Sequence, residues 1–180
     1  TFIAKSDNFV SKVLSVCFDH SGNIYAGTSV GIIGKIDPDT GRIVTTYDAN
    51  SSSKCCIYAL TAVPGGCFAS GDSNGEVKIW DPNTATVINK FTSHQYEIKA
   101  LAANDQFLWA SGVDPTIVTF CYTKNSNSWS HFSTKTRVHD HEVTCLAAAE
   151  KNSPYCISGS IDTTFFIKKT IYPFQAPPPV

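Results

Sequence analysis

The sequence lacks methionine entirely, and it contains no Cys-x-x-Cys pair, no apolar run of 18 residues and no excess of either charge. Its 180 residues carry 14 Lys and Arg against 15 Asp and Glu, so the overall charge does not favour nucleic acid, although a local basic patch is compatible with it. The missing apolar run predicts no membrane span. The start shows no basic segment followed by an apolar one, so no secretory signal is expected. The missing initial methionine leads us to expect a piece of a longer protein.

Motifs of known catalytic chemistry are also missing. There is no GxSxG, no phosphate-binding P-loop and no GxGxxG, and the carboxylates are dispersed in turns. His139 and His141 have the spacing of a metal-binding pair, but no Cys-x-x-Cys or acidic cluster stands ready to complete a zinc site. Cys145 lies inside an alternating apolar run, where packing is the ordinary role of a thiol. We therefore expect no enzyme, no metal, no cofactor and no small-molecule substrate.

A fourfold internal repeat decides the fold. Each copy has an apolar strand, a turn, a second strand that ends in a small residue and a glycine, another turn, and a third strand. That glycine recurs at positions 27, 71, 112 and 159, so the separations are 44, 41 and 47 residues. Such spacing is close to the roughly 40–45 residues of a four-stranded propeller blade. β-Branched and aromatic residues crowd the runs, and no helical apolar stripe is sustained.

The repeat predicts an all-β chain with the fold of a WD40-type β-propeller. A single blade cannot bury both faces of its sheet, so blades stack around an axis. We expect four consecutive blades of a larger ring, with seven blades as the expected total. Residues 1–172 form this partial propeller, and 173–180 form a Pro-rich linker or tail that lacks the N–H groups of an outer strand. A closed four-bladed ring, with residues 1–5 as its closing strand, is the alternative. The expected blades span approximately residues 9–50, 51–94, 95–138 and 139–172.

Two histidines occupy a recurring position in the repeats. His94 and His139 each lie four residues before a first strand. In WD blades a histidine at this place pairs with an aspartate in the turn between the second and third strands. We expect His139, Ser158 and Asp162 to form a buried hydrogen-bonded chain, which would be strongly penalised by the loss of one partner.

The second repeat carries most of the same pattern. Trp80 and Asp81 form the dipeptide after which WD repeats are named, at the end of the third strand. Ser70 and Asn74 occupy the positions of the serine and the turn aspartate, and Ser53 stands in place of the histidine. We expect these residues to hold the blade together.

The third repeat holds the least usual segment, between its third and fourth strands. Lys124, Trp129, Lys135 and Arg137 are candidates for contact with a partner or with RNA, because an exposed tryptophan beside basic groups can stack on a base or anchor a protein. The alternative, which we favour, is a hairpin in which Trp129 opens an outer strand and packs on the blade. Lys168 and Lys169 form a second basic spot, interpreted as a solvated strand edge.

Longer stretches resemble one family. Residues 69–81, 109–115 and 129–164 are similar, in this order, to blades of the cirhin-like proteins, subunits of the small-subunit processome associated with U3 small nucleolar RNA. In the second stretch, the Ser-Gly-Val-Asp turn at 111–114 is interpreted as one residue shorter than the usual WD turn. Together these stretches cover most of residues 55–168.

The resemblance implies a function. Cirhin-like proteins are nucleolar scaffolds with tandem propellers that act in pre-18S rRNA processing and in rRNA transcription, without a cofactor. Their implied partners are other processome subunits and pre-rRNA, and protein–protein contact is the expected role of these blades. The main rival is another intracellular WD-repeat scaffold, such as a ubiquitin-ligase substrate receptor with arginines at the axial mouth, but Arg42 and Arg137 are the only arginines here. An enzymatic propeller is the second rival, and it would need inward-facing carboxylates or metal ligands.

Overall fold

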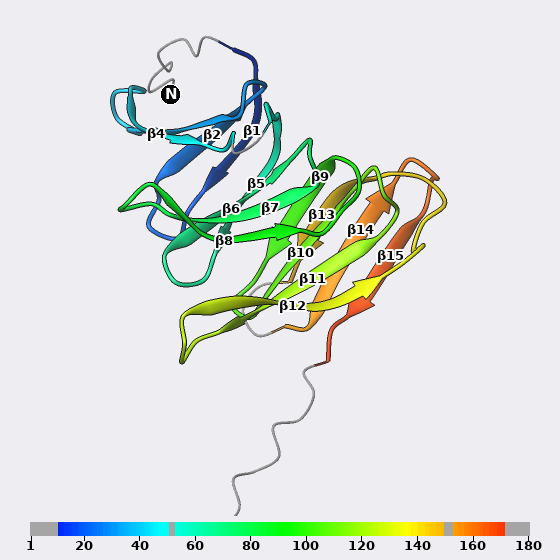
Figure 1. The fold of residues 1–180 in the computed structure, drawn as a ribbon. Coiled ribbons are helices and arrows are strands. Elements are labelled where there is room, and N and C mark those ends of the chain that lie inside the picture. The colour runs from blue at the N-terminus through cyan, green and yellow to red at the C-terminus, as the bar shows by residue number, and fades with distance from the viewer. Residues whose placement is uncertain (1–10, 51–52, 150–152, 172–180) are drawn as a thin grey trace, which may run out of the picture.

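Fifteen strands form four antiparallel sheets that follow one another along the chain (Figure 1). This computed structural model describes residues 11–50, 53–149 and 153–171. The expected closing strand at 1–5 and the Pro-rich segment at 173–180 lie outside the described residues. None of the described residues forms a helix long and apolar enough to cross a membrane.

Each sheet is a meander in which consecutive strands pair. Blade 1 consists of β1 (Val13–Phe18), β2 (Ile24–Thr28), β3 (Ile32–Ile36) and β4 (Ile43–Asp48). Blade 2 consists of β5 (Ile57–Val63), β6 (Cys67–Asp72), β7 (Glu76–Asp81) and β8 (Thr86–Thr92). Blade 3 consists of β9 (Ile98–Ala103), β10 (Phe107–Gly112), β11 (Ile117–Thr123) and β12 (Ser128–Lys135). Blade 4 consists, within the described residues, of β13 (Val143–Ala148), β14 (Tyr155–Ser160) and β15 (Phe165–Lys169).

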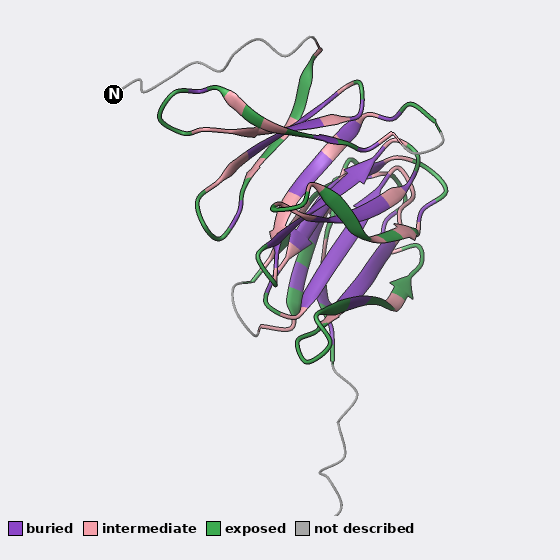
Figure 2. Cartoon of the chain, turned by 60° about the vertical axis from the view of Figure 1, so that its left-hand side comes forward, coloured by how far each residue is buried: buried purple, intermediate pink, exposed green. Residues whose placement is uncertain are grey.

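The sheets stack face to face, with their first strands together on the inner side. β1 contacts β5, β5 contacts β9, and β9 contacts β13, whereas the fourth strands lie on the outer side (Figure 1). The middle strands β6 and β10 are buried along their whole length, because each is covered by a neighbouring sheet on both faces (Figure 2). The predicted all-β propeller architecture is confirmed.

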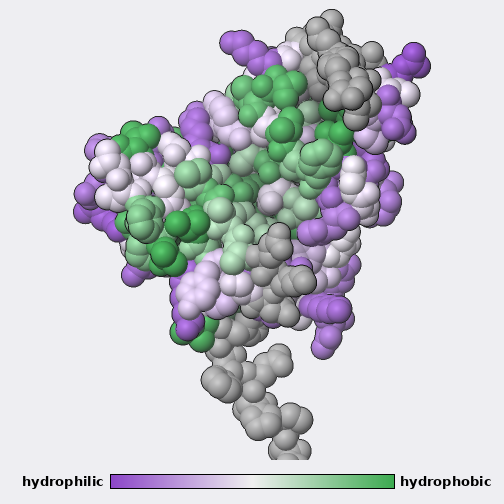
Figure 3. Space-filling model, turned by 180° about the vertical axis from the view of Figure 1, so that it is seen from behind, coloured by the Kyte–Doolittle hydropathy of each residue, from purple (hydrophilic) through white to green (hydrophobic). Residues whose placement is uncertain are grey.

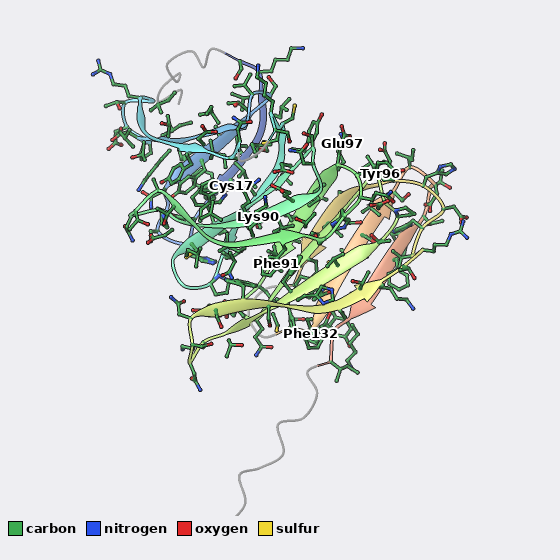
Figure 4. The ribbon with its side chains drawn as sticks, viewed as in Figure 1. Cys17, Lys90, Phe91, Tyr96, Glu97 and Phe132 are labelled. Atoms are coloured by element: carbon green, nitrogen blue, oxygen red, sulfur yellow. The ribbon has the colours of Figure 1, made fainter. Side chains whose placement is uncertain are left out.

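Apolar side chains fill the space between each pair of sheets. Aromatic rings dominate the layer between blades 1 and 2, where Phe68 stacks on Tyr25 with ring centroids 4.3 Å apart. Between blades 2 and 3, Phe91 stacks on Phe120 at 4.6 Å (Figure 4). Trp109 contributes to the layer between blades 3 and 4. Each layer joins side chains from two repeats, so the blades stabilise one another.

The outer faces of the two end blades carry exposed apolar side chains. Val16 and Phe18 of β1 are 67% and 65% exposed, and Phe165 and Ile167 of β15 are 70% and 57% exposed. Figure 3 shows apolar residues at both ends of the molecule, seen from behind. In blades 2 and 3 the corresponding faces are covered by a neighbouring sheet. The chain is therefore part of a propeller, with two faces suited to further blades.

The strand register corrects the alignment of the third repeat. In blade 2, Ala59 pairs with Gly71, whereas the equivalent Ala100 of blade 3 pairs with Ser111. Gly112 therefore lies one position beyond the other three repeat glycines. A Cβ at Gly112 would collide with the backbone that enters β9, so the close approach of these two segments requires glycine there.

The third repeat is shortened before its second strand and not after it. The second and third strands of blades 2 and 3 pair in the same register, so the turn between them has the same length in both blades. The first connection differs, because Ala103 pairs with Leu108 whereas Ala62 pairs with Phe68. The prediction of a shortened turn at 111–114 is therefore wrong.

Candidate functional site

A hydrogen-bonded chain crosses blade 4 from its entry segment to its third strand. His139 is buried, and its Nε2 lies 2.8 Å from the Ser158 hydroxyl. Its Nδ1 lies 3.1 Å from an Asp162 carboxylate oxygen and 3.0 Å from the Thr164 hydroxyl. The Thr164 hydroxyl donates to Asp162 at 2.6 Å and, with the backbone N–H groups of Asp140 and Thr164, holds the pKa of that carboxyl well below its usual range. The predicted residues thus lie together, and Thr164 joins them.

Blade 2 divides the same network into two pairs. The Trp80 indole N–H donates to the Ser70 hydroxyl at 2.9 Å, and both side chains are buried. The Asn74 side-chain amide donates to the Ser53 hydroxyl at 3.0 Å in an exposed position. Serine and asparagine therefore replace the histidine–aspartate pair of blade 4 together, and neither is left without its counterpart.

Asp81, the second residue of the WD dipeptide, stabilises a turn. Its carboxylate accepts a hydrogen bond from the backbone N–H of Asn83 at 2.8 Å and from the Thr84 hydroxyl at 2.9 Å. These bonds lower the pKa of Asp81. The contacts that the structure describes for Asp81 are thus local to the turn between β7 and β8.

Blade 3 keeps the histidine but has lost its partners. The register places Ala110 where blade 2 has Ser70, and Phe120 where blade 2 has Trp80. His94 is buried, its Nδ1 lies 3.0 Å from the Ser93 hydroxyl, and its Nε2 has no hydrogen-bond partner among the described residues. Burial also lowers its pKa. Because no serine stands opposite Nε2, the chain seen in blade 4 does not form here.

Replacement of Ala110 by serine is expected to stabilise the protein. The new hydroxyl would give His94 Nε2 the partner that Ser158 gives His139, and a satisfied buried hydrogen bond contributes about 1 kcal/mol. Urea unfolding should show the gain as a higher midpoint with an unchanged slope. The control is Ala69→Ser, which adds a hydroxyl to the neighbouring, fully buried alanine position of blade 2 and is expected to lower the midpoint. Equal destabilisation by both substitutions would contradict the assignment.

Two lysines that sequence reasoning did not single out are buried. Lys78 lies 2.7 Å from Asp72 and 2.7 Å from Glu76. Burial favours the neutral amine, but the hydrogen bonds to these two carboxylates outweigh it and raise the pKa of Lys78. Lys168 pairs with Cys156 as Trp80 pairs with Phe68 in blade 2, so it takes the tryptophan position of blade 4.

The interpretation of Lys168 as a solvated edge residue is wrong. Its Nζ lies 2.6 Å from the Thr119 hydroxyl of blade 3, and it is only 9% exposed. Burial lowers its pKa to about 8, and the nearby Lys135 acts in the same direction. Lys169, the next residue, is exposed as predicted. Alternation along β15 explains the difference, since neighbouring residues of a strand point to opposite faces.

Replacement of Lys168 by methionine is expected to remove a pH dependence of stability. Between pH 8 and the ordinary lysine pKa of 10.5, the unfolded chain binds more protons at this residue than the folded one, so its effect on stability improves as pH rises. The variant should be more stable than the parent at pH 7, by about 1–3 kcal/mol, with a difference that shrinks toward pH 10.5. Urea unfolding at several pH values measures this, and Lys169→Met is the matched control.

The four candidate contact residues of blade 3 separate into two kinds. Lys124, Lys135 and Arg137 are exposed. Trp129 is 6% exposed and packs against Tyr122, with ring centroids 5.2 Å apart. The indole therefore presents no free face for stacking on a base, in agreement with the favoured alternative of a packed hairpin.

The described residues offer little material for a reactive site. No group of three or more His, Cys, Asp and Glu side chains among them could hold a metal ion. All seven cysteines are free, and burial raises the pKa of Cys17 and Cys156 to about 12, which keeps these thiols protonated. Cys145 is exposed, contrary to the expectation that it packs in a core, because no further sheet covers that face of β13 in the described residues.

Comparison with known families identifies the class of protein. The WD40 family, described as "WD domain, G-beta repeat", matches residues 41–81, which include β4 through β7. This stretch holds Ser70, Trp80 and Asp81. With four stacked antiparallel meanders around it, the chain is part of a WD40-type β-propeller.

Individual relatives are more specific. The U3 small nucleolar RNA-associated protein 4 of Schizosaccharomyces pombe is 28% identical over 160 residues, which cover 84% of this chain and 22% of that protein. The human homolog of the same name is 28% identical over 170 residues, which cover 87% of this chain and 24% of that protein. These relatives confirm the resemblance to the cirhin-like proteins. The chain spans about a quarter of their length.

Solved structures support the fold alone. The structure of U3-55K superposes with a TM-score of 0.74 at 15% sequence identity, covering 89% of this chain and 53% of that chain. The four blades thus correspond to about half of that chain.

Proposed function

We propose that this chain is a non-catalytic scaffold segment of ribosome biogenesis. It serves in the nucleolus, within the U3-containing small-subunit processome, in pre-18S rRNA processing and in rRNA transcription. Its partners are other processome subunits and the pre-rRNA held by the complex. The observation that carries the proposal is the similarity, over most of the chain, to relatives named U3 small nucleolar RNA-associated protein 4.

The geometry of the polar residues supports a scaffold. The networks around His139 and Trp80 connect strands within a blade, and their members contact one another. The burial of these groups between stacked sheets favours a structural role over contact with a substrate. A rigid stack of sheets leaves its outer strands and connecting turns free for partners.

Affinity purification of the full-length protein from cells tests the proposal. The partners are identified by mass spectrometry, and the bound RNA is sequenced. We expect processome subunits together with U3 RNA and spacer pre-rRNA. Recovery of a ubiquitin-ligase complex without pre-rRNA would overturn the proposed function while leaving the propeller intact.

A further inference from the structure

The outer side of blade 3 concentrates positive charge without compensating acids. No carboxylate occurs between Asp114 and Asp140 in the sequence. Within that stretch Lys124, Lys135 and Arg137 are exposed, and none of them forms an ion pair with a described residue. In a chain of net charge −1 this is a local reversal of sign. We call these three side chains the basic rim.

The basic rim follows one edge strand. β12 is the outermost strand of its sheet, eight residues long, and therefore spans about 26 Å. Lys124 lies in the hairpin before it, Lys135 ends it, and Arg137 follows. The outer strand of blade 2 differs, because Lys90 there is paired with Glu76. Positive charge without a partner is thus a feature of the blade 3 edge.

The shape of the edge favours a flexible polyanion over a pairing β-strand. The β11–β12 register shifts between Thr119 and Phe120, so a bulge interrupts β12. Bulges and edge lysines oppose the addition of a further strand. A polymer with regularly spaced negative charges can instead contact cations about 26 Å apart without pairing its backbone to β12.

We propose that the basic rim binds the phosphate backbone of single-stranded RNA. Exposed Ser128, Ser130 and Thr134 add hydroxyl groups along the same strand that can bond to phosphate oxygens. Trp129 is buried and supplies no stacking surface, so recognition is by charge and independent of base sequence. This inference rests on the proposed function, because it assigns the RNA contact of that scaffold to one edge.

Salt-dependent binding tests the basic rim. A fluorescent single-stranded uridine 20-mer is titrated with the purified full-length protein at several salt concentrations. For the triple variant Lys124→Gln, Lys135→Gln and Arg137→Gln we expect at least a tenfold loss of affinity at low salt. The slope of log affinity against log salt should fall in magnitude by about 2, since each phosphate contact on a single strand contributes about 0.7.

The matched control removes the same number of charges from blades 1 and 2. Lys12, Arg42 and Lys54 are exposed there, and their replacement by glutamine should leave affinity and slope unchanged within twofold. An equal loss in both triple variants would overturn the rim, as would competition by polyglutamate as strong as that by RNA. If the rim variant loses no RNA affinity but still copurifies with processome subunits, the rim assignment fails and the proposed function stands.

Discussion

Replacement of Trp80 by alanine is expected to destabilise the protein by about 3–5 kcal/mol, because truncation of a buried tryptophan leaves a cavity that its neighbours fill only in part. The indole is 1% exposed and lies edge-on to Tyr47, with ring centroids 5.9 Å apart. The substitution also leaves the buried Ser70 hydroxyl without its indole partner. Urea unfolding measures the loss, and Val87→Ala on the exposed outer strand, expected to change stability by less than about 1 kcal/mol, is the control.

A smaller change at the same place tests how serine and tryptophan depend on each other. Blade 3 holds alanine and phenylalanine where blade 2 holds Ser70 and Trp80. Trp80→Phe alone should therefore cost more than Trp80→Phe combined with Ser70→Ala minus the cost of Ser70→Ala. We expect a coupling of about 1 kcal/mol in this double-mutant cycle. Additive effects would show that the indole–hydroxyl bond contributes nothing beyond packing.

The repeat length and the strand pattern were sufficient to predict the fold. Four apolar meanders of similar length leave few arrangements other than stacked blades, because each sheet must bury two faces. The chain of His139, Ser158 and Asp162 was equally accessible, since all its members occupy fixed places in a repeat of ordinary length.

Register was harder to predict than architecture. A glycine after a serine at position 112 matches the motif of the other repeats, yet strand pairing moves it by one position. The sequence could not show this, because a deletion before the second strand and one after it leave the same motif spacing. The pairing partners decide, and through them Ala110 replaces the serine opposite His94.

Burial of single lysines was also beyond sequence reasoning. Lys168 and Lys169 are chemically identical neighbours, and which of them points into the stack depends on the face that β15 turns toward blade 3. The phenylalanines at 165 and 166 are equally ambiguous for the same reason. A buried lysine at the tryptophan position has no signal in composition or spacing.

Replacement of His139 by leucine is expected to cost about 2–3 kcal/mol, whereas the same change at His94 should alter stability by less than about 1 kcal/mol. Leucine at 139 strands the buried Ser158 hydroxyl and removes the imidazole that bridges it to Asp162, and an unpaired buried polar group costs about 1–3 kcal/mol. At position 94 the substitution removes a ring nitrogen that already lacks a partner. Both side chains are comparably buried, at 4% and 6% exposure, so the comparison isolates hydrogen bonding.

The order of the two effects is the informative result. Packing losses are similar for two buried imidazoles, so a difference of more than about 1 kcal/mol between the variants reports on the bonds that only His139 makes. If His94→Leu proved as damaging as His139→Leu, the Nε2 of His94 would need a partner that the strand register does not provide. If neither variant lost stability, the blade 4 chain would not contribute to folding, and packing between sheets alone would hold that blade. Unfolding of the Ala110→Ser, His94→Leu double variant completes the test, because the benefit of the new serine should vanish with the histidine.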